Sequence, residues 1–292
     1  MPAPNPKSKI RRLQQRKLNP TASTAQAKSA PPQAIILAAG KGTRMGGDAG
    51  NTLPKVVYPV ADRPMVWWVV KACRDAGVSR CIVVIGYKGE LVQEALADVP
   101  GVEYVEQREQ LGTGHATRMA EPLLRGQSLD VFVLAGDGPL IRQATLEQLL
   151  DTHRRTGAAA TLATSVIADP TGYGRVVRDA DGGFGQIVEQ KDATPEQRRI
   201  TEVNPSYYCF ASDGLFRTLR QLRNDNKQGE YYLTDVPALL KAQGKTVTVE
   251  DAVPPEDVLS INTPQQLAEV DGILRKRLGI WIDPAACGFA RQ

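Results

Sequence analysis

The chain has 292 residues, of which 42% are hydrophobic, and a formal net charge of +4 at pH 7. This length suffices for one large α/β domain or two smaller ones, and the composition is ordinary for a globular protein. The positive charge does not indicate a nucleic-acid-binding domain, because residues 1–33 contain seven Lys and Arg and no Asp or Glu, and the rest of the chain carries −3.

Residues 1–33 are rich in Pro, Ala, Ser and Gln, and such a segment cannot bury enough apolar surface to fold. We expect a solvated, disordered tail; weak binding to nucleic acid or to an acidic membrane is the alternative. The tail lacks the apolar centre of a secretory signal, and no apolar run approaches the roughly 20 residues that span a bilayer. The sequence therefore predicts a cytoplasmic protein with no specific nucleic-acid or membrane partner.

From residue 34 onward, short β-branched runs alternate with amphipathic stretches. The expected strands are residues 34–37, 81–85, 102–106 and 131–134, and the expected helices are residues 64–76, 90–97, 113–124 and 145–155. Such alternation predicts a Rossmann-like, doubly wound, mostly parallel sheet. Ligands of these sheets bind beyond the carboxyl ends of the strands.

After about residue 158, closely spaced strand candidates are separated by Gly, Asp and Pro. We expect them to form a smaller antiparallel or mixed excursion, which would be the far wall of a ligand cleft. Thr263 should cap a final helix that has Pro264 in its first turn. The other expected elements are strands at residues 160–167, 174–178, 185–189, 206–210, 246–249 and 258–261, and helices at residues 212–222 and 232–242.

A glycine-rich loop with a cation follows the first expected strand. Gly40 and Gly42 allow a sharp turn and let backbone N–H groups approach phosphate oxygens. Arg44 in this loop and Lys55, in a Leu-Pro-Lys segment, would supply full positive charge. The pattern is neither the Walker A loop nor the G-x-G-x-x-G fingerprint, and alone it can be only a turn. The second cation favours a phosphate-handling site.

Two segments could complete such a site. Asp137 follows the strand at residues 131–134, and Mg²⁺ is typically held by one or two protein oxygens together with phosphates and water. An Asp between glycines is also ordinary turn chemistry. Gln107 and Gln110 follow the third strand, and their amides suit the imide face of a pyrimidine. Carboxylate and amide groups that suit sugar hydroxyls follow at residues 171–175, 187–193 and 202–204.

Taken together, these motifs resemble the uridyltransferase domain of the bacterial bifunctional N-acetylglucosamine-1-phosphate uridyltransferase/glucosamine-1-phosphate acetyltransferase family. The similarity runs in order through roughly residues 33–280. The broader sugar-nucleotide pyrophosphorylases share only the first loop, the lysine and the aspartate. The segments that carry the resemblance are residues 37–45, 53–56, 110–116, 136–140, 170–176, 187–197 and 228–235.

The resemblance implies roles for individual residues. The uridine moiety would be held by the backbone of Leu37, Ala38, Ala39 and Gly40 and by Gln107, Gly112 and Thr113. Arg44 and Lys55 would neutralise the triphosphate and the sugar phosphate, and Asp137 and Asn262 would hold Mg²⁺. The sugar would be contacted by Gly174, Glu189 and Asn204, with Gln110 and Lys191 as further candidates.

The implied reaction is Mg²⁺-dependent transfer of UMP from UTP to N-acetylglucosamine-1-phosphate, which gives UDP-N-acetylglucosamine and pyrophosphate. Two alternatives are a uridylyl- or thymidylyltransferase for another sugar-1-phosphate and a non-catalytic nucleotide-sugar sensor. The sequence leaves the oligomeric state open.

The chain also departs from the family pattern. Residues 46–52 are longer than the usual link, and Pro205-Ser206 replaces the common Thr-Gly near the sugar. We expect a folded domain at residues 34–280. Residues 281–292 would be an extension that resembles the entry to the family's acetyltransferase β-helix, so that acetyltransferase activity would be missing.

Overall fold

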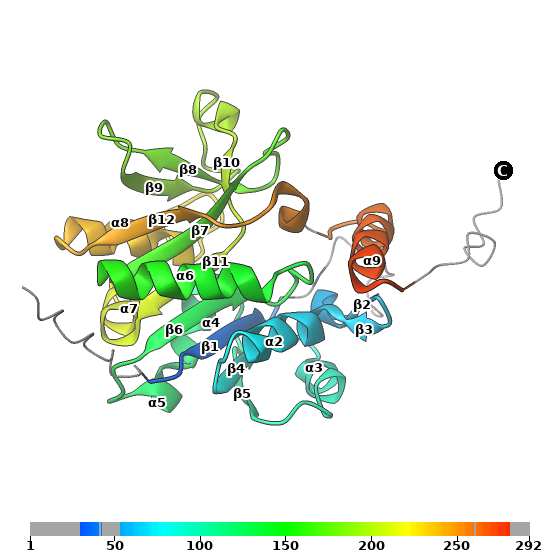
Figure 1. The fold of residues 1–292 in the computed structure, drawn as a ribbon. Coiled ribbons are helices and arrows are strands. Elements are labelled where there is room, and N and C mark those ends of the chain that lie inside the picture. Colours follow the sequence, from blue (N-terminus) through cyan, green and yellow to red (C-terminus); the bar gives the residue numbers. More distant parts are fainter. Residues whose placement is uncertain (1–29, 41, 43–52, 260, 281–292) are drawn as a thin grey trace, which may run out of the picture. The chain divides into compact units, whose positions relative to one another are not determined.

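A computed structural model describes residues 30–40, 42, 53–259 and 261–280 (Figure 1). Arg44, nearly all of the expected tail and the expected C-terminal extension lie outside these residues. No helix in the described part of the chain combines the length and the apolarity that crossing a membrane requires.

Four parallel strands form the first half of a central sheet (Figure 1). Nearly all apolar residues of the three inner strands are buried, as expected for a parallel sheet that is covered on both faces, and those of the edge strand are half-buried. Because the strands share one direction, the glycine loop after the first strand and the Asp137 turn emerge at the same edge. In spatial order the strands are β5 (Val102–Glu106), β4 (Arg80–Ile85), β1 (Gln33–Ala38) and β6 (Asp130–Ala135).

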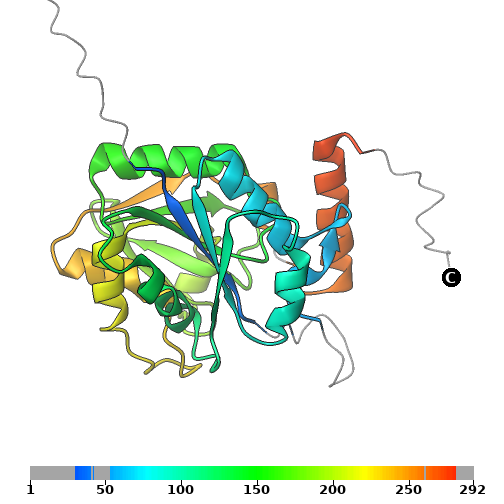
Figure 2. The ribbon, with the colours of Figure 1, turned by 90° about the horizontal axis from the view of Figure 1, so that it is seen from below.

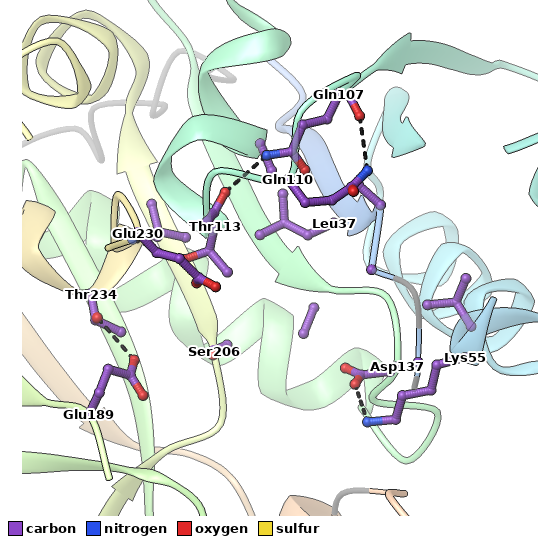
Figure 3. A pocket seen from close by; sticks show the side chains of 18 of the residues that line it. Leu37, Lys55, Gln107, Gln110, Thr113, Asp137, Glu189, Ser206, Glu230 and Thr234 are labelled. Atoms are coloured by element: carbon purple, nitrogen blue, oxygen red, sulfur yellow. Dashed lines mark hydrogen bonds and ion pairs between the residues drawn. The ribbon is translucent and has the colours of Figure 1, made fainter. Parts of the chain in front are cut away.

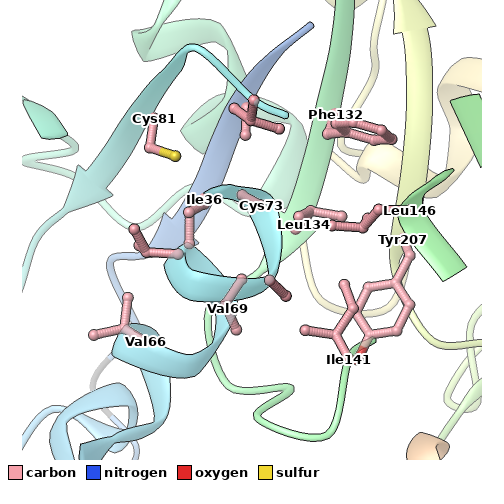
Figure 4. Packing of buried hydrophobic residues seen from close by; sticks show 14 of the residues in the cluster. Ile36, Val66, Val69, Cys73, Cys81, Phe132, Leu134, Ile141, Leu146 and Tyr207 are labelled. Atoms are coloured by element: carbon pink, nitrogen blue, oxygen red, sulfur yellow. The ribbon is translucent and has the colours of Figure 1, made fainter. Parts of the chain in front are cut away.

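Helices cover both faces of this sheet, and Figure 2 shows α2 and α6 on one side of the strands and α7 on the other. Alternate residues of β1 point to opposite faces. Ile36 belongs to the same apolar cluster as Val69 of α2 and Leu146 of α6 (Figure 4), whereas Ile35 belongs to the cluster on the other face. The first face carries α2 (Met65–Asp75), α3 (Gly89–Ala95) and α6 (Gln143–Thr156), and the second carries α4 (Thr113–Met119), α5 (Glu121–Leu124), α7 (Ser212–Leu219) and α8 (Val236–Ala242).

The second half of the sheet is mixed, as the sequence predicts. In it, β11 lies antiparallel between β6 and β7, and β12 pairs parallel with β7. An antiparallel extension then runs from β7 through β10 and β8 to β9. The strands are β7 (Ala160–Val166), β8 (Gly174–Arg178), β9 (Phe184–Val188), β10 (Glu202–Asn204), β11 (Tyr207–Ala211) and β12 (Val247–Asp251).

Pro205 and Ser206 separate β10 from β11, and the two strands differ in one of their neighbours in the sheet. Both strands pair with β7, but the other neighbour of β11 is β6, whereas that of β10 is β8. Ser206 has φ 65°, in the left-handed region that a side chain disfavours. This break separates the antiparallel extension from the parallel half of the sheet.

The last helix, α9 (Pro264–Leu278), packs on a short hairpin formed by β2 (Pro59–Val60) and β3 (Arg63–Pro64) (Figure 1). Val60 and Leu274 belong to the apolar cluster between them. The predicted cap is confirmed, because Thr263 Oγ1 accepts a hydrogen bond from Gln266 N at 3.2 Å. Since α9 follows Asn262 directly, its attachment to the hairpin limits where Asn262 can lie.

One expected element is wrong. Pro255–Val258 form a 3₁₀ helix, η5, instead of the start of a strand at residues 258–261, and neither residue 259 nor residue 261 is in a strand. Two consecutive prolines, at 254 and 255, restrict the backbone at this point. The buried Asp257 then accepts hydrogen bonds from Arg142 and Arg277, which hold the turn against α6 and α9.

Several boundaries also differ from expectation. The helix expected at residues 113–124 is divided into α4 and α5, and the one at residues 232–242 into the 3₁₀ helix η4 (Leu233–Asp235) and α8. A proline stands in the first turn of both α5 and α8, where it lacks the N–H that would continue a preceding helix. Elements that were not expected are β2, β3, β10 and the 3₁₀ helices η2 (Lys55–Val57) and η3 (Gln197–Arg199).

Candidate active site

Two adjoining cavities open at the carboxyl edge of the parallel strands, beside the break between β10 and β11. Their volumes are about 340 Å³ and about 220 Å³. Figure 3 shows the first, with Gln107 and Gln110 at one end and with Asp137 and Lys55 lying apart from Glu189. The cavities form one continuous site, because they share five lining residues. These are Lys55, Ala135, Asp137, Glu189 and Ser206.

The first cavity contains nearly all of the residues expected to hold uridine. Ala38 is the exception, since it is only 1% exposed and packs in the core cluster on the α2 face. The expected role of Ala38 concerns its backbone and stays a prediction. The expected residues that do line the cavity are Leu37, Ala39, Gly40, Gln107, Gly112 and Thr113. Gln110, which the resemblance gives as a further sugar candidate and whose amide also suits a base, lines this cavity and not the second one.

Hydrogen bonds fix the loop between β5 and α4. The amide of the buried Gln107 donates from Nε2 to Gly112 O at 3.1 Å, and the same nitrogen lies 3.0 Å from His115 Nδ1. Gln110 Nε2 donates to Gln107 O at 3.5 Å. The two amides are therefore held together at one end of the cavity, and their expected role in binding a base stays a prediction.

This loop is paired with a segment more than a hundred residues later in the chain. Gly114 N donates to Tyr231 O at 2.8 Å, and Tyr231 N donates to Leu111 O at 2.8 Å. Gly112 has φ 103°, and a Cβ atom at this position would lie 2.7 Å from Tyr231 O. Only glycine allows both this conformation and this close approach.

The same pairing brings into the first cavity three residues to which no specific role is assigned from the sequence. Leu233 N donates to Thr113 Oγ1 at 3.0 Å, and Glu230, Leu233 and Thr234 line the cavity. Residues 228–235 are one of the segments that resemble the family. In the sequence, this resemblance is the feature that indicates that they belong to the site. In the folded chain this segment contacts the loop at residues 111–114.

A cation and two oxygen ligands meet where the two cavities join. Lys55 Nζ donates to Asp137 Oδ2 at 2.6 Å and to Asn262 Oδ1 at 3.2 Å. Lys55 begins η2, Asp137 follows β6, and Asn262 precedes α9. The structure thus brings together three residues to which the resemblance assigns phosphate or metal binding.

The glycine loop after β1 packs directly on this lysine. Gly42 has φ 66°, and a Cβ atom there would lie 2.8 Å from Lys55 Cβ. Gly40 and Gly42 both line the first cavity. Arg44 lies outside the described residues, and its expected role stays a prediction.

The oxygens of Asp137 and Asn262 are suited to Mg²⁺. Both lie within hydrogen-bonding distance of one ammonium group, so they converge on a single point of positive charge. Among the described residues, no group of three or more His, Cys, Asp or Glu side chains could hold a metal ion. A magnesium ion held by these two oxygens would therefore take its other ligands from substrate phosphates and water.

The second cavity contains the three residues expected to contact the sugar, namely Gly174, Glu189 and Asn204. The carboxylate of Glu189 accepts a hydrogen bond from Thr234 Oγ1 at 3.0 Å, and burial raises the pKa of Glu189 above its usual range. A Cβ atom on Gly174 would lie 3.7 Å from both carboxylate oxygens. Gly174 therefore lies beside an acceptor that could bind hydroxyl groups.

The amide of Asn204 is oriented by its neighbours. Its Nδ2 donates to Tyr208 Oη at 2.6 Å, and its Oδ1 accepts from Ser206 N at 3.2 Å. Lys191, in contrast, lines neither cavity; its exposed Nζ donates to Gln228 Oε1 at 2.6 Å.

With the site described, comparison with known proteins identifies the family. Residues 34–242 match the model of the MobA-like NTP transferase domain. The chain belongs to this family. The matched residues include Lys55, Asp137 and all residues that line the first cavity, whereas Asn262 lies beyond the match.

Curated relatives give a narrower comparison. The chain is 45% identical over 261 residues to the bifunctional protein GlmU of Geobacter metallireducens, which covers 87% of this chain and 54% of that protein. It is 46% identical over 243 residues to GlmU of a Cyanothece species, which covers 83% of this chain and 52% of that protein. The chain thus spans about half the length of the curated relatives that it matches.

Among solved structures, UDP-glucose pyrophosphorylase complexed with UDP-glucose superposes with a TM-score of 0.69. The alignment covers 85% of this chain and 100% of that one, at 19% identity. This similarity concerns the fold, and it confirms the predicted Rossmann-like sheet with a mixed excursion.

Proposed function

We propose that this protein transfers UMP from UTP to N-acetylglucosamine-1-phosphate and releases UDP-N-acetylglucosamine and pyrophosphate. The observation that carries the proposal is the meeting of Lys55, Asp137 and Asn262 at the junction of two cavities. A transferase for two phosphate-bearing substrates needs a compartment for each, with charge-stabilising groups between them. The similarity to GlmU proteins supports the choice of substrates.

In this proposal the first cavity binds the nucleotide. The side chains of Gln107 and Gln110 face the base, and the glycine loop after β1 contacts the phosphates through backbone N–H groups. Lys55 lies at the opposite end of this cavity from the two amides, as Figure 3 shows. The triphosphate would therefore extend from the amides toward Lys55.

The second cavity binds the sugar phosphate. Glu189 offers a half-buried carboxylate to sugar hydroxyl groups, and Asn204 offers an amide that its neighbours already orient. Gly174 lines the cavity beside Glu189 and would contact the sugar ring. The phosphate of this substrate would point toward Lys55 and Asp137, which also line this cavity.

The chemistry is an in-line displacement at the α-phosphorus of UTP. A phosphate oxygen of the sugar phosphate forms the new P–O bond, and the bond from the α-phosphorus to the bridging oxygen breaks, so that its electron pair leaves with pyrophosphate. The attacking oxygen is already anionic, and no protein base is required. Lys55 would align the two anions and stabilise the charge on the phosphorus oxygens.

Asp137 and Asn262 would hold Mg²⁺ at this junction. The bound metal would neutralise phosphate charge and orient the phosphates for displacement. We propose that the enzyme acts in the cytoplasm.

The test is a pyrophosphate-release assay with purified protein, UTP and Mg²⁺. The sugar panel contains the 1-phosphates of N-acetylglucosamine, glucosamine, glucose and galactose, and dTTP replaces UTP in a parallel series. We expect kcat/KM for N-acetylglucosamine-1-phosphate to exceed the others by about tenfold or more. A preference for another sugar or for dTTP would support the alternative transferase, and the absence of any turnover would support a non-catalytic sensor.

A further inference from the structure

The side chain of Arg175 is one of the largest fully buried side chains in the described part of the molecule, and it lines neither cavity. Only 1% of the residue is exposed. A buried guanidinium is normally paired with a carboxylate, because an unpaired buried charge is costly. Yet no ion pair joins Arg175 to an Asp or Glu of the described residues, although its neighbour on the same strand, Arg178, is paired with Glu202.

Neutral oxygens from three segments hold the guanidinium of Arg175 instead. Its Nη1 donates to Tyr173 O, and its Nη2 donates to Gln190 Oε1 at 2.7 Å and to Arg198 O at 3.4 Å. Gln190 Oε1 also accepts a hydrogen bond from Gly172 N at 3.3 Å. One side chain therefore ties the turn before β8 to the loop after β9 and to η3.

These segments form the sugar-side wall of the second cavity. Gly172, Tyr173, Gly174 and Glu189 line it, and two of them adjoin the network in sequence, since Gly174 precedes Arg175 and Glu189 precedes Gln190. A displacement of the wall would move both the backbone of Gly174 and the carboxylate of Glu189, which we assign to sugar hydroxyl groups. Glu189 also lines the first cavity, but the end of that cavity with the two glutamine amides has its own supports, the hydrogen bonds between residues 111–114 and residues 231–233.

The wall is also connected to the segment that precedes Asn262. Tyr173 Oη donates to Val258 O, the last residue of η5, at 2.9 Å. Through Tyr173, Arg175 is linked to the far side of the same cavity, where Val258 and Asn262 are lining residues.

We propose that Arg175 is a positioning residue for the sugar-phosphate half of the site. This inference rests on the proposed function, and it assigns the residue a role in only one of the two substrate sites. The guanidinium is suited to the role because its donors lie in a rigid planar fork that can bridge several acceptors at once. The ammonium group of a lysine has a flexible stem and cannot reproduce this arrangement.

The experiment compares Arg175→Met, Arg175→Lys and Arg178→Met with the wild type. Steady-state pyrophosphate release gives KM separately for N-acetylglucosamine-1-phosphate and for UTP. We expect Arg175→Met to raise KM for the sugar phosphate by about tenfold or more and to leave KM for UTP within about twofold. Arg175→Lys should not restore the wild-type KM, and Arg178→Met, on the same strand, should leave both KM values unchanged.

Gln190→Ala provides a second variant if Arg175→Met does not fold. It removes the oxygen that bridges Arg175 to Gly172 N, from a side chain that is only partly buried. We expect a smaller rise in KM with the same selectivity for the sugar phosphate.

Three results would contradict the role of Arg175 in an active wild-type enzyme. They are equal rises in both KM values, a lower melting temperature with unchanged kinetics, and full rescue by lysine. A wild-type protein that releases no pyrophosphate with any sugar phosphate would instead contradict the proposed function, so that the two failures are distinguishable.

Discussion

Replacing Lys55 by methionine would remove the charge at the junction of the cavities and keep most of the aliphatic stem that packs on Gly42. Lys55 Nζ lies 2.6 Å from Asp137 Oδ2, and the two side chains are 15% and 34% exposed. At an effective dielectric constant of about 20, such a pair attracts by roughly 6 kcal/mol. Desolvation of both groups and screening offset most of this energy, so we expect a net loss of stability of about 1 kcal/mol. For a domain of this size, the melting temperature should fall by roughly 2–4 °C.

The larger effect should be on turnover. If Lys55 stabilises charge on the transferring phosphorus oxygens, its loss resembles removal of one oxyanion-binding donor, which costs about 10²–10³ in kcat. We expect Lys55→Met to lower kcat for pyrophosphate release by about 10² or more. Steady-state assays with UTP and N-acetylglucosamine-1-phosphate, together with thermal unfolding, measure the two effects on the same preparation.

A matched control is available on α2. Lys71 Nζ lies 2.8 Å from Asp75 Oδ2 in an exposed i,i+4 pair, and Lys71→Met should leave kcat unchanged. If kcat of Lys55→Met stayed within about fivefold of the wild type, Lys55 would have no major role in the transition state. If kcat and the melting temperature both collapsed, the lysine would be structural.

Three further predictions concern the glycines and acids around the site. Gly112→Ala and Gly182→Ala both place alanine at positive φ, but a Cβ meets a neighbour within 4 Å only at 112. Each variant should lose about 1 kcal/mol or more of stability. Only Gly112→Ala should weaken UTP binding, by about tenfold or more, as measured by calorimetry. Burial raises the pKa of Asp235 from 3.8 to about 6, so its stabilising contribution is present below about pH 4 and is lost as pH rises through 6. Asp235→Asn should therefore stabilise the protein more at pH 7.5 than at pH 4.5, with a difference in unfolding free energy of about 1 kcal/mol after allowance for partial exposure. The melting temperature measured at both pH values checks this, and equal shifts would contradict it. A Cβ on Gly138 would collide with the Tyr207 hydroxyl, so Gly138→Ala should reduce stability and turnover, and Tyr207→Phe should restore part of both; additive losses in the double mutant would exclude the collision.

Local sequence patterns determined the parallel half of the sheet and the edge at which the site lies. The apolar runs of β1, β4 and β6 are buried as predicted, because a strand covered on both faces needs apolar residues at successive positions. Parallel strands place their carboxyl ends at one edge, so the positions of Gly40 and Asp137 followed from strand direction alone. The cap at Thr263 was also predictable, since it depends only on neighbouring residues.

Other features were decided by tertiary contacts that no local pattern encodes. Lys55 and Asn262 are 207 residues apart, and their hydrogen bond depends on the packing of α9 against β2 and β3. The break at Ser206 exists because β10 and β11 have different second neighbours, and such a change of partner leaves periodicity along the chain unaltered. The network around Arg175 cannot be predicted from the sequence for the same reason. In the sequence Arg175 is a single charged residue in a strand, and only the folded wall supplies the oxygens that make its burial possible.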